Sequence, residues 1–136
     1  MTTELQILAW SIVLGFAQIS VTTMMITKIR GPAWNVSARD EKQAELTGVT
    51  GRLDRATQNF KETFPFFVAA VVISEFVSRA TGKENHLSAI GAHIYFWSRV
   101  IYVPLYAAGV PVVRTFVWTA SIVGILMVLS TAILAV

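Results

Sequence analysis

The sequence has no cysteine and few charged residues. Without cysteine the chain itself can form no disulfide, thiolate nucleophile or sulfur-ligated metal site, so any thiol in its chemistry must arrive with a substrate. Charged residues make up 14% of the 136 residues and hydrophobic ones 54%, whereas soluble domains usually carry about 25% charged residues. Together with a mean hydropathy of +0.61, this composition predicts an integral membrane protein.

Four apolar segments are each long enough to cross a hydrocarbon core of about 30 Å, which needs roughly 20 helical residues. They predict transmembrane helices over about 5–29, 46–78, 88–108 and 112–136, within one domain spanning 1–136. We do not expect the first segment to be a signal peptide, because it opens with the acidic Glu4 and lacks a small-x-small cleavage site. Gly31-Pro32 should end its helix. The expected fold class is an all-α, four-transmembrane-helix bundle.

The basic residues predict how the chain is oriented. Seven Lys or Arg lie between Lys28 and Lys61, whereas the opposite side of a four-span chain carries only Arg79 and Lys83. The positive-inside rule therefore places the long first loop in the cytoplasm and both termini on the other side. A net charge of +3, lying in loops, favours a lipid bilayer rather than nucleic acid as the partner.

The second segment opens with a polar stripe. At about 100° per residue, Arg52, Arg55, Asn59 and Glu62 fall within roughly 80° of one another. Ionisable groups at a membrane edge are expensive, so this face should meet a polar partner or a bound ligand. A network that only ties helices together would give the same pattern. Pro65 should kink the helix and free a backbone carbonyl near this stripe.

The third segment carries a second polar face. Tyr95, Arg99, Tyr102 and Tyr106 lie within roughly 60° around its axis. Arg114 stands in the first turn of the fourth segment, and the predicted orientation brings all these residues to the cytoplasmic half. That shared depth would allow the two faces to form one site.

Other polar residues have simpler interpretations. Glu75 and Arg79 are spaced for a local ion pair. His86 is expected in a solvated loop, and His93 has no second ligand at i+4, so no metal site is predicted.

The two polar faces suggest a ligand class. Guanidinium groups clamp carboxylates in bidentate fashion, and Glu62 can accept an ammonium group. A complementary ligand would carry at least two carboxylates and one amine. Glutathione fits this description, and so do other small zwitterionic peptides.

Two motifs resemble those of the MAPEG family, the membrane-associated proteins in eicosanoid and glutathione metabolism. The family's helix-two motif is similar to Arg52-x-x-Arg55-Ala56-x-x-Asn59-x-x-Glu62-x-x-Pro65, and its helix-three motif to Phe96-Trp97-Ser98-Arg99-Val100-Ile101-Tyr102-Val103-Pro104-Leu105-Tyr106. The resemblance extends to chain length and number of spans. Thr57 departs from the pattern, since many members have His or Gln there.

The resemblance implies a homotrimer that binds glutathione as a co-substrate between neighbouring subunits. An arginine at the start of helix four activates the thiol in characterised members, and the nearest match, the implied catalytic residue, is Arg114. Glu62 would lie near the glutamyl amine. The implied binding residues are Arg30, Arg52, Arg55, Asn59, Glu62, Arg99, Tyr102 and Tyr106.

The implied function is a glutathione-dependent transferase or peroxidase in a bacterial inner membrane, acting on lipophilic electrophiles or lipid hydroperoxides. Two alternatives stay open. One is a non-catalytic member of the same type, whose Arg/Glu network serves trimer packing alone. The other is a small proton-coupled transporter that uses Glu62 or Glu75 as its membrane carboxylate.

Overall fold

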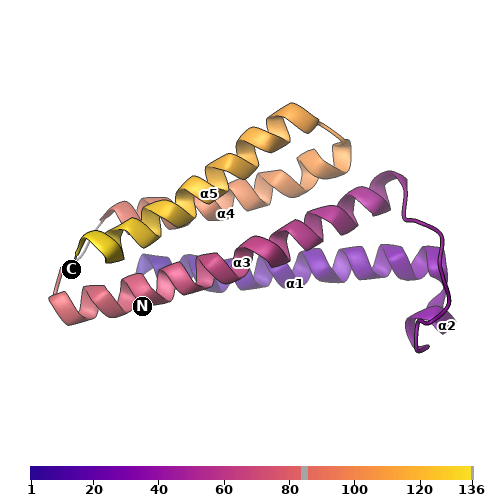
Figure 1. The fold of residues 1–136 in the computed structure, drawn as a ribbon, viewed down its shortest axis with the longest axis horizontal. Helices are drawn as coiled ribbons and strands as arrows, with labels where there is room; N and C mark the ends of the chain where they lie inside the picture. Colours follow the sequence, from indigo (N-terminus) through magenta and orange to yellow (C-terminus); the bar gives the residue numbers. More distant parts are fainter. Residues whose placement is uncertain (84–85, 136) are drawn as a thin grey trace.

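The computed structural model of the chain describes residues 1–83 and 86–135, and over that part it contains helices and no strand. The predicted end of the fourth helix at Val136 lies outside the described residues. All other ends of the long helices fall within three residues of the predicted ones. The helices are α1 (Thr3–Arg30), α2 (Pro32–Asn35), α3 (Gly48–Thr81), α4 (His86–Ala108) and α5 (Pro111–Leu134) (Figure 1).

The short helix α2 follows directly on the predicted stop at Gly31-Pro32. Gly31 has a φ of 88°, a conformation that side chains with a Cβ rarely adopt, and it ends α1 there as predicted. Pro32 then begins α2, where its missing N–H is not needed. This turn of helix was not predicted, because we expected only a long loop between the first two predicted helices.

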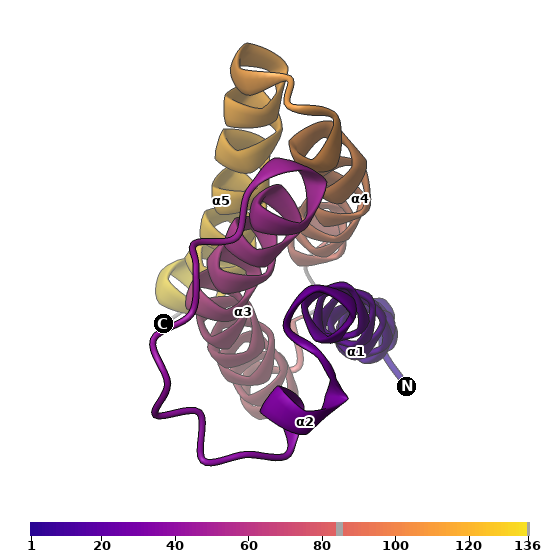
Figure 2. The same cartoon turned by 90° about the vertical axis from the view of Figure 1, so that its right-hand side faces the viewer.

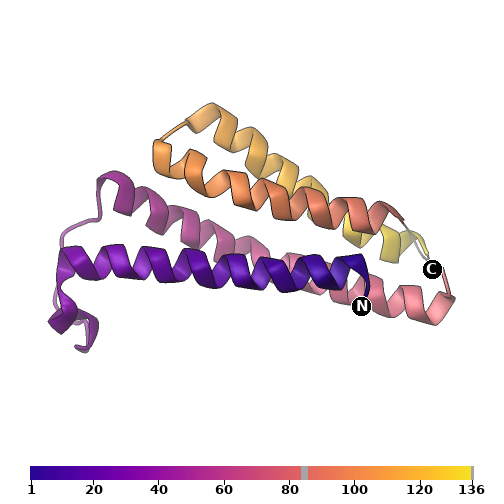
Figure 3. The same cartoon turned by 180° about the vertical axis from the view of Figure 1, so that it is seen from behind.

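The four long helices run side by side, with α3 in the most central position (Figures 1 and 2). α3 packs against α1, α4 and α5, and α1 also packs against α4. Both chain ends lie at one end of the bundle, and α2 and the turn between α4 and α5 lie at the other (Figures 1 and 3). Pro65 lies inside α3, which continues unbroken to Thr81.

The apolar core fills the half of the bundle near the chain ends. α4 and α5 approach each other there through two glycines. A Cβ on Gly91 would lie 2.7 Å from the carbonyl oxygen of Gly124, and a Cβ on Gly124 would lie 2.6 Å from that of Gly91. Larger residues would push the helices apart. The core consists of Ile7, Leu8, Phe67, Ala70, Val71, Ala92, Tyr95, Ile125 and Val128.

Hydroxyl pairs connect the helices along their length. The Oγ1 atoms of Thr22 and Thr57 lie 2.8 Å apart and connect α1 to α3. Ser74 Oγ and Thr131 Oγ1 lie 2.9 Å apart and connect α3 to α5. Thr57 is buried, so its hydroxyl serves helix packing.

Three helices in the described part of the chain, α1, α3 and α5, are long and apolar enough to cross a membrane. Only 28–33% of their most apolar stretches is buried inside the bundle. Large apolar side chains such as Phe16, Phe66 and Phe116 are exposed on the outside. An apolar outer surface on apolar helices fits a bilayer as the surrounding medium.

The sequence predicted a fourth span, but α4 does not meet the same criterion. Its polar side chains lower its hydropathy. The structure buries three large ones, Tyr95, Arg99 and Tyr102, inside the bundle. Ile90 and Trp97 are exposed on its outer face. The surface that α4 presents outward therefore includes large apolar side chains despite its modest overall hydropathy.

Candidate functional site

A small recess lies between α3, α4 and α5, in the half of the bundle away from the chain ends. Its volume is about 180 Å³. The sequence singled out four of its lining residues, which three separate helices bring together. No carboxylate stands among the lining residues, which are Asn59, Tyr102, Tyr106, Arg114, Thr115 and Trp118.

Arg114 is fixed at the wall of the recess by an aromatic ring. Its guanidinium carbon lies 4.4 Å from the ring centre of Tyr106, a cation–π distance. Tyr106 in turn packs edge-on against Tyr102, with 5.4 Å between ring centres. In residues 1–83 and 86–135, no carboxylate forms an ion pair with Arg114. Arg114 therefore brings to the wall of the recess a positive charge that has no ion-pair partner in those residues.

Arg99 lies behind the recess rather than in its lining. Its side chain is only 2% exposed. Nη1 donates to Oδ1 of Asn59 over 2.8 Å, and Nη2 donates to Oγ1 of Thr63 over 2.5 Å. The rings of Tyr95 and Tyr102 lie 5.6 and 5.3 Å from its guanidinium carbon. Both terminal nitrogens of Arg99 thus donate to groups of its own chain, whereas the resemblance implied that Arg99 contacts the ligand.

Thr63 was missed by the sequence analysis. It follows Asn59 by four residues, so it lies on the same side of α3, and the spacing alone would have included it. Thr115 and Trp118 also line the recess without having been predicted as binding residues. Trp118 lies one helical turn beyond Arg114, and that spacing was the available signal.

The polar stripe of α3 divides into two rows, a division that the sequence analysis did not predict. Arg52 and Asn59, seven residues apart, are partly buried, and Arg52 Nε donates to the carbonyl oxygen of Ala107 over 2.8 Å. Arg55 and Glu62, also seven apart, are exposed. We call the first pair the inner row and the second the outer row. Seven residues make almost two turns, so each pair shares one azimuth.

Arg30 contacts the short helix α2 instead of the recess. Its guanidinium carbon lies 4.6 Å from the ring centre of Trp34, and that of Arg39 lies 4.8 Å from the same ring. Arg30 Nη2 also donates to the carbonyl oxygen of Ala44 over 3.5 Å. Within one chain, the structure does not bring Arg30 to the residues that line the recess.

The model of the MAPEG family matches residues 7–134 of the chain. The chain belongs to the MAPEG family. The family membership that the two helix motifs suggested is thereby confirmed, and the chain is a membrane protein of a family associated with glutathione and eicosanoid metabolism. The MAPEG match includes the recess and both rows of α3. A comparison with curated proteins gives no match.

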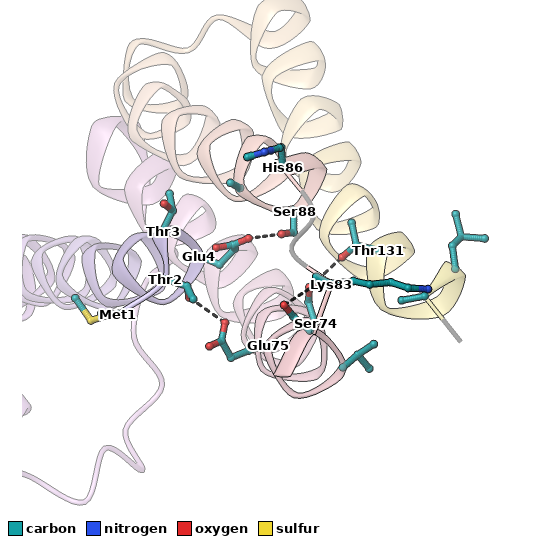
Figure 4. A pocket seen from close by; sticks show the side chains of 15 residues that line it. Met1, Thr2, Thr3, Glu4, Ser74, Glu75, Lys83, His86, Ser88 and Thr131 are labelled. Atoms are coloured by element: carbon teal, nitrogen blue, oxygen red, sulfur yellow. Dashed lines mark hydrogen bonds between the residues drawn. The ribbon is translucent and has the colours of Figure 1, made fainter. Parts of the chain in front are cut away.

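A second, larger cavity of about 570 Å³ lies at the end of the MAPEG chain that holds its termini. Figure 4 shows Glu4 and Glu75 projecting toward it from different helices. Both carboxylates are occupied: Ser88 donates a hydrogen bond to Glu4, and Thr2 Oγ1 donates to Glu75 over 2.9 Å. Arg79 pairs with Glu75 at 2.8 Å, which confirms the predicted ion pair. These contacts tie helix ends together.

Proposed function

We propose that the chain is a glutathione-dependent membrane transferase or peroxidase acting on lipophilic electrophiles or lipid hydroperoxides. The observation that carries this proposal is Arg114, stacked on Tyr106 at the wall of a recess whose lining contains no carboxylate. Such a recess suits an anionic group. Because the chain has no cysteine, the thiol would come with glutathione.

Glutathione would bind between neighbouring subunits of a homotrimer. The outer row of α3 supports this, because Arg55 and Glu62 are exposed in the single chain and could face both a neighbour and a ligand. Glu62 would accept the glutamyl amine and Arg55 would clamp a carboxylate. Arg30, which stacks on Trp34 in its own chain, would contribute from a neighbouring copy.

Arg114 would act electrostatically. A nearby positive charge favours the thiolate and lowers the pKa of a thiol from about 8.5. Toward a carbon electrophile, the thiolate forms a C–S bond while the leaving group departs with its electron pair. Toward a hydroperoxide, sulfur attacks one oxygen, the O–O bond breaks, and the alkoxide takes a proton to give an alcohol. A second glutathione then converts the sulfenic acid to the disulfide and water.

The proposed membrane frame treats α4 as the fourth span, since Arg99 and its tyrosines are buried inside the bundle. The loop between α1 and α3 would face the cytoplasm of a bacterial inner membrane. The recess would then lie near the cytoplasmic surface, where glutathione is available. The lipophilic substrate would approach from the bilayer between the helices.

The direct test uses purified protein in detergent. Calorimetry with glutathione should show saturable binding, and 1-chloro-2,4-dinitrobenzene or cumene hydroperoxide should be turned over in its presence. If neither substrate is turned over and glutathione does not bind, the proposal is wrong. Size measurement of the protein–detergent complex tests the trimer separately.

The two alternatives make different predictions. A non-catalytic protein would show no rise in melting temperature with glutathione, since only a ligand that binds the folded state stabilises it. A proton-coupled transporter needs a carboxylate that is free to exchange protons, and Glu75 has less support in this role because it pairs with Arg79. Proton-driven efflux that is lost in Glu75→Gln would favour the transporter.

A further inference from the structure

We infer that Arg99 is a positioning residue that holds the side-chain amide of Asn59 with its NH₂ group toward the recess, so that the bound ligand must present a hydrogen-bond acceptor there. The inference rests on the proposed function. It assigns Arg99 an indirect role in place of direct ligand contact.

The first step is the chemistry of the contact. A guanidinium carries only donors, so the atom of Asn59 that lies 2.8 Å from Arg99 Nη1 must be the carbonyl oxygen Oδ1. The amide is planar, so fixing its oxygen also fixes its nitrogen. Since Asn59 lines the recess, the Nδ2 group is the part of its amide left to serve a ligand.

The second step is that nothing else uses the Nδ2 group. Within residues 1–83 and 86–135, the only side-chain hydrogen bond of Asn59 is the one from Arg99, and its amide nitrogen is not among the buried atoms without a partner. This donor is therefore both open and unpaired. It suits a carbonyl, a carboxylate or a thiolate, and it disfavours an ammonium group.

The third step is why Arg99 can impose this orientation. Thr63 Oγ1 accepts a hydrogen bond from the second terminal nitrogen of Arg99. The rings of Tyr95 and Tyr102 make cation–π contacts with its guanidinium group. Because Arg99 is 2% exposed, water does not compete for its donors. No carboxylate in the described chain pairs with it, so its positive charge also adds to the potential in the recess.

The first variant that tests this is Asn59→Asp. Aspartate keeps the shape and the acceptor toward Arg99, and it gives that buried cation a carboxylate partner, so the melting temperature should stay equal or rise. The open donor becomes an acceptor, however, and glutathione binding should weaken at least tenfold. A purely structural tie between α3 and α4 predicts unchanged binding.

The second test compares Arg99→Lys with Arg99→Met. Both lose the two-pronged contact, but only lysine can still donate to Oδ1 and hold the amide in place. The KM for glutathione should rise at least tenfold in Arg99→Met and clearly less in Arg99→Lys. Thr63→Val is the matched control, because it removes the other bond of Arg99 and leaves the side chain of Asn59 unchanged. From Asn59 it removes only the hydrogen bond that Thr63 Oγ1 donates to the backbone carbonyl oxygen over 3.0 Å. It should lower the melting temperature and raise the KM clearly less than Arg99→Met does, because Arg99 Nη1 can still donate to Oδ1 of Asn59.

The outcomes separate the inference from the proposed function. Wild-type protein that binds no glutathione overturns both. Wild-type binding that persists unchanged in Asn59→Asp overturns the inference alone, and so does a Thr63→Val protein that loses affinity as strongly as Arg99→Met. If the Arg99 variants fail to fold, comparing the glutathione affinities of Asn59→Asp and Thr63→Val still decides whether the inference holds.

Discussion

The two halves of the bundle are built in opposite ways. In the half near the chain ends, which we call the closed half, α4 and α5 touch through Gly91 and Gly124 and an apolar core fills the interior. In the other half, which we call the recess half, buried Arg99 lies among tyrosines and hydroxyl groups. Between Gly91 and Gly124 the close backbone packing leaves no space for a ligand, whereas long polar side chains lie between the helices in the recess half. The closed half thus provides stability and the recess half provides a site.

The largest expected effect is on activity, in the recess half. Arg114→Leu should lower the transferase or peroxidase rate by about 10²-fold, the usual loss when one stabilising group for a developing anion is removed. The pKa of the bound thiol should rise, so the remaining activity should shift to higher pH. Thiolate absorbance near 240 nm and the pH–rate profile measure both effects.

Arg39→Leu is the control for Arg114→Leu. It removes the same charge, but Arg39 stacks on Trp34 away from the recess. The activity and the pH–rate profile of Arg39→Leu should match those of the wild type. An equal loss in both variants would mean that net charge, rather than the position of Arg114, sets the rate.

The next largest effect is on stability, in the closed half. Gly124→Ala places a Cβ 2.6 Å from the carbonyl oxygen of Gly91 and 2.8 Å from the backbone nitrogen of Tyr95. Overpacking of this kind costs about 1–3 kcal/mol, so the melting temperature in detergent should fall. Leu126→Ala, on the exposed outer face, is the control and should change the melting temperature little.

A smaller effect is expected where α1 meets α3. Thr57→Val leaves the buried hydroxyl of Thr22 without the partner that lies 2.8 Å away, which should lower the free energy of unfolding by about 1 kcal/mol. In the double variant Thr22→Val/Thr57→Val both partners are apolar, so the free energy of unfolding should recover most of the way to the wild-type value. A double variant that is less stable than the single one would contradict this explanation.

The smallest effect is expected from the ion pair at the bundle end. Arg79 is 70% exposed in its pair with Glu75, so Arg79→Ala should change the free energy of unfolding by at most about 1 kcal/mol. Raising the ionic strength should reduce the difference further. A larger, salt-independent loss would show that this end of the bundle carries more of the stability than its exposure suggests.

The sequence was sufficient for the four long helices of the fold and for four of the six residues that line the recess. Hydrophobic segment length placed the four long helices. Helical spacing identified Asn59, Tyr102 and Tyr106, and the family resemblance identified Arg114; the structure brings these four residues together. Asn59 and the two tyrosines each share a helix face with other polar residues of the same helix, so periodicity alone detects them.

The division of the α3 stripe could not be predicted from the sequence. Spacing gives the direction of each side chain around its own helix, but the boundary between inside and outside depends on where α4 packs. Arg52 and Asn59 fall on one side of that boundary and Arg55 and Glu62 on the other. The stacking of Arg30 on Trp34 was unpredictable for a related reason, since it depends on the unforeseen α2.

Both chain ends lie at the end of the bundle opposite the recess (Figure 1). A reporter fused to either terminus would therefore stand clear of the recess and leave its chemistry measurable. In the proposed orientation, alkaline phosphatase joined to the last helix would be active in intact cells, whereas green fluorescent protein exported in unfolded form to the same place would stay dark.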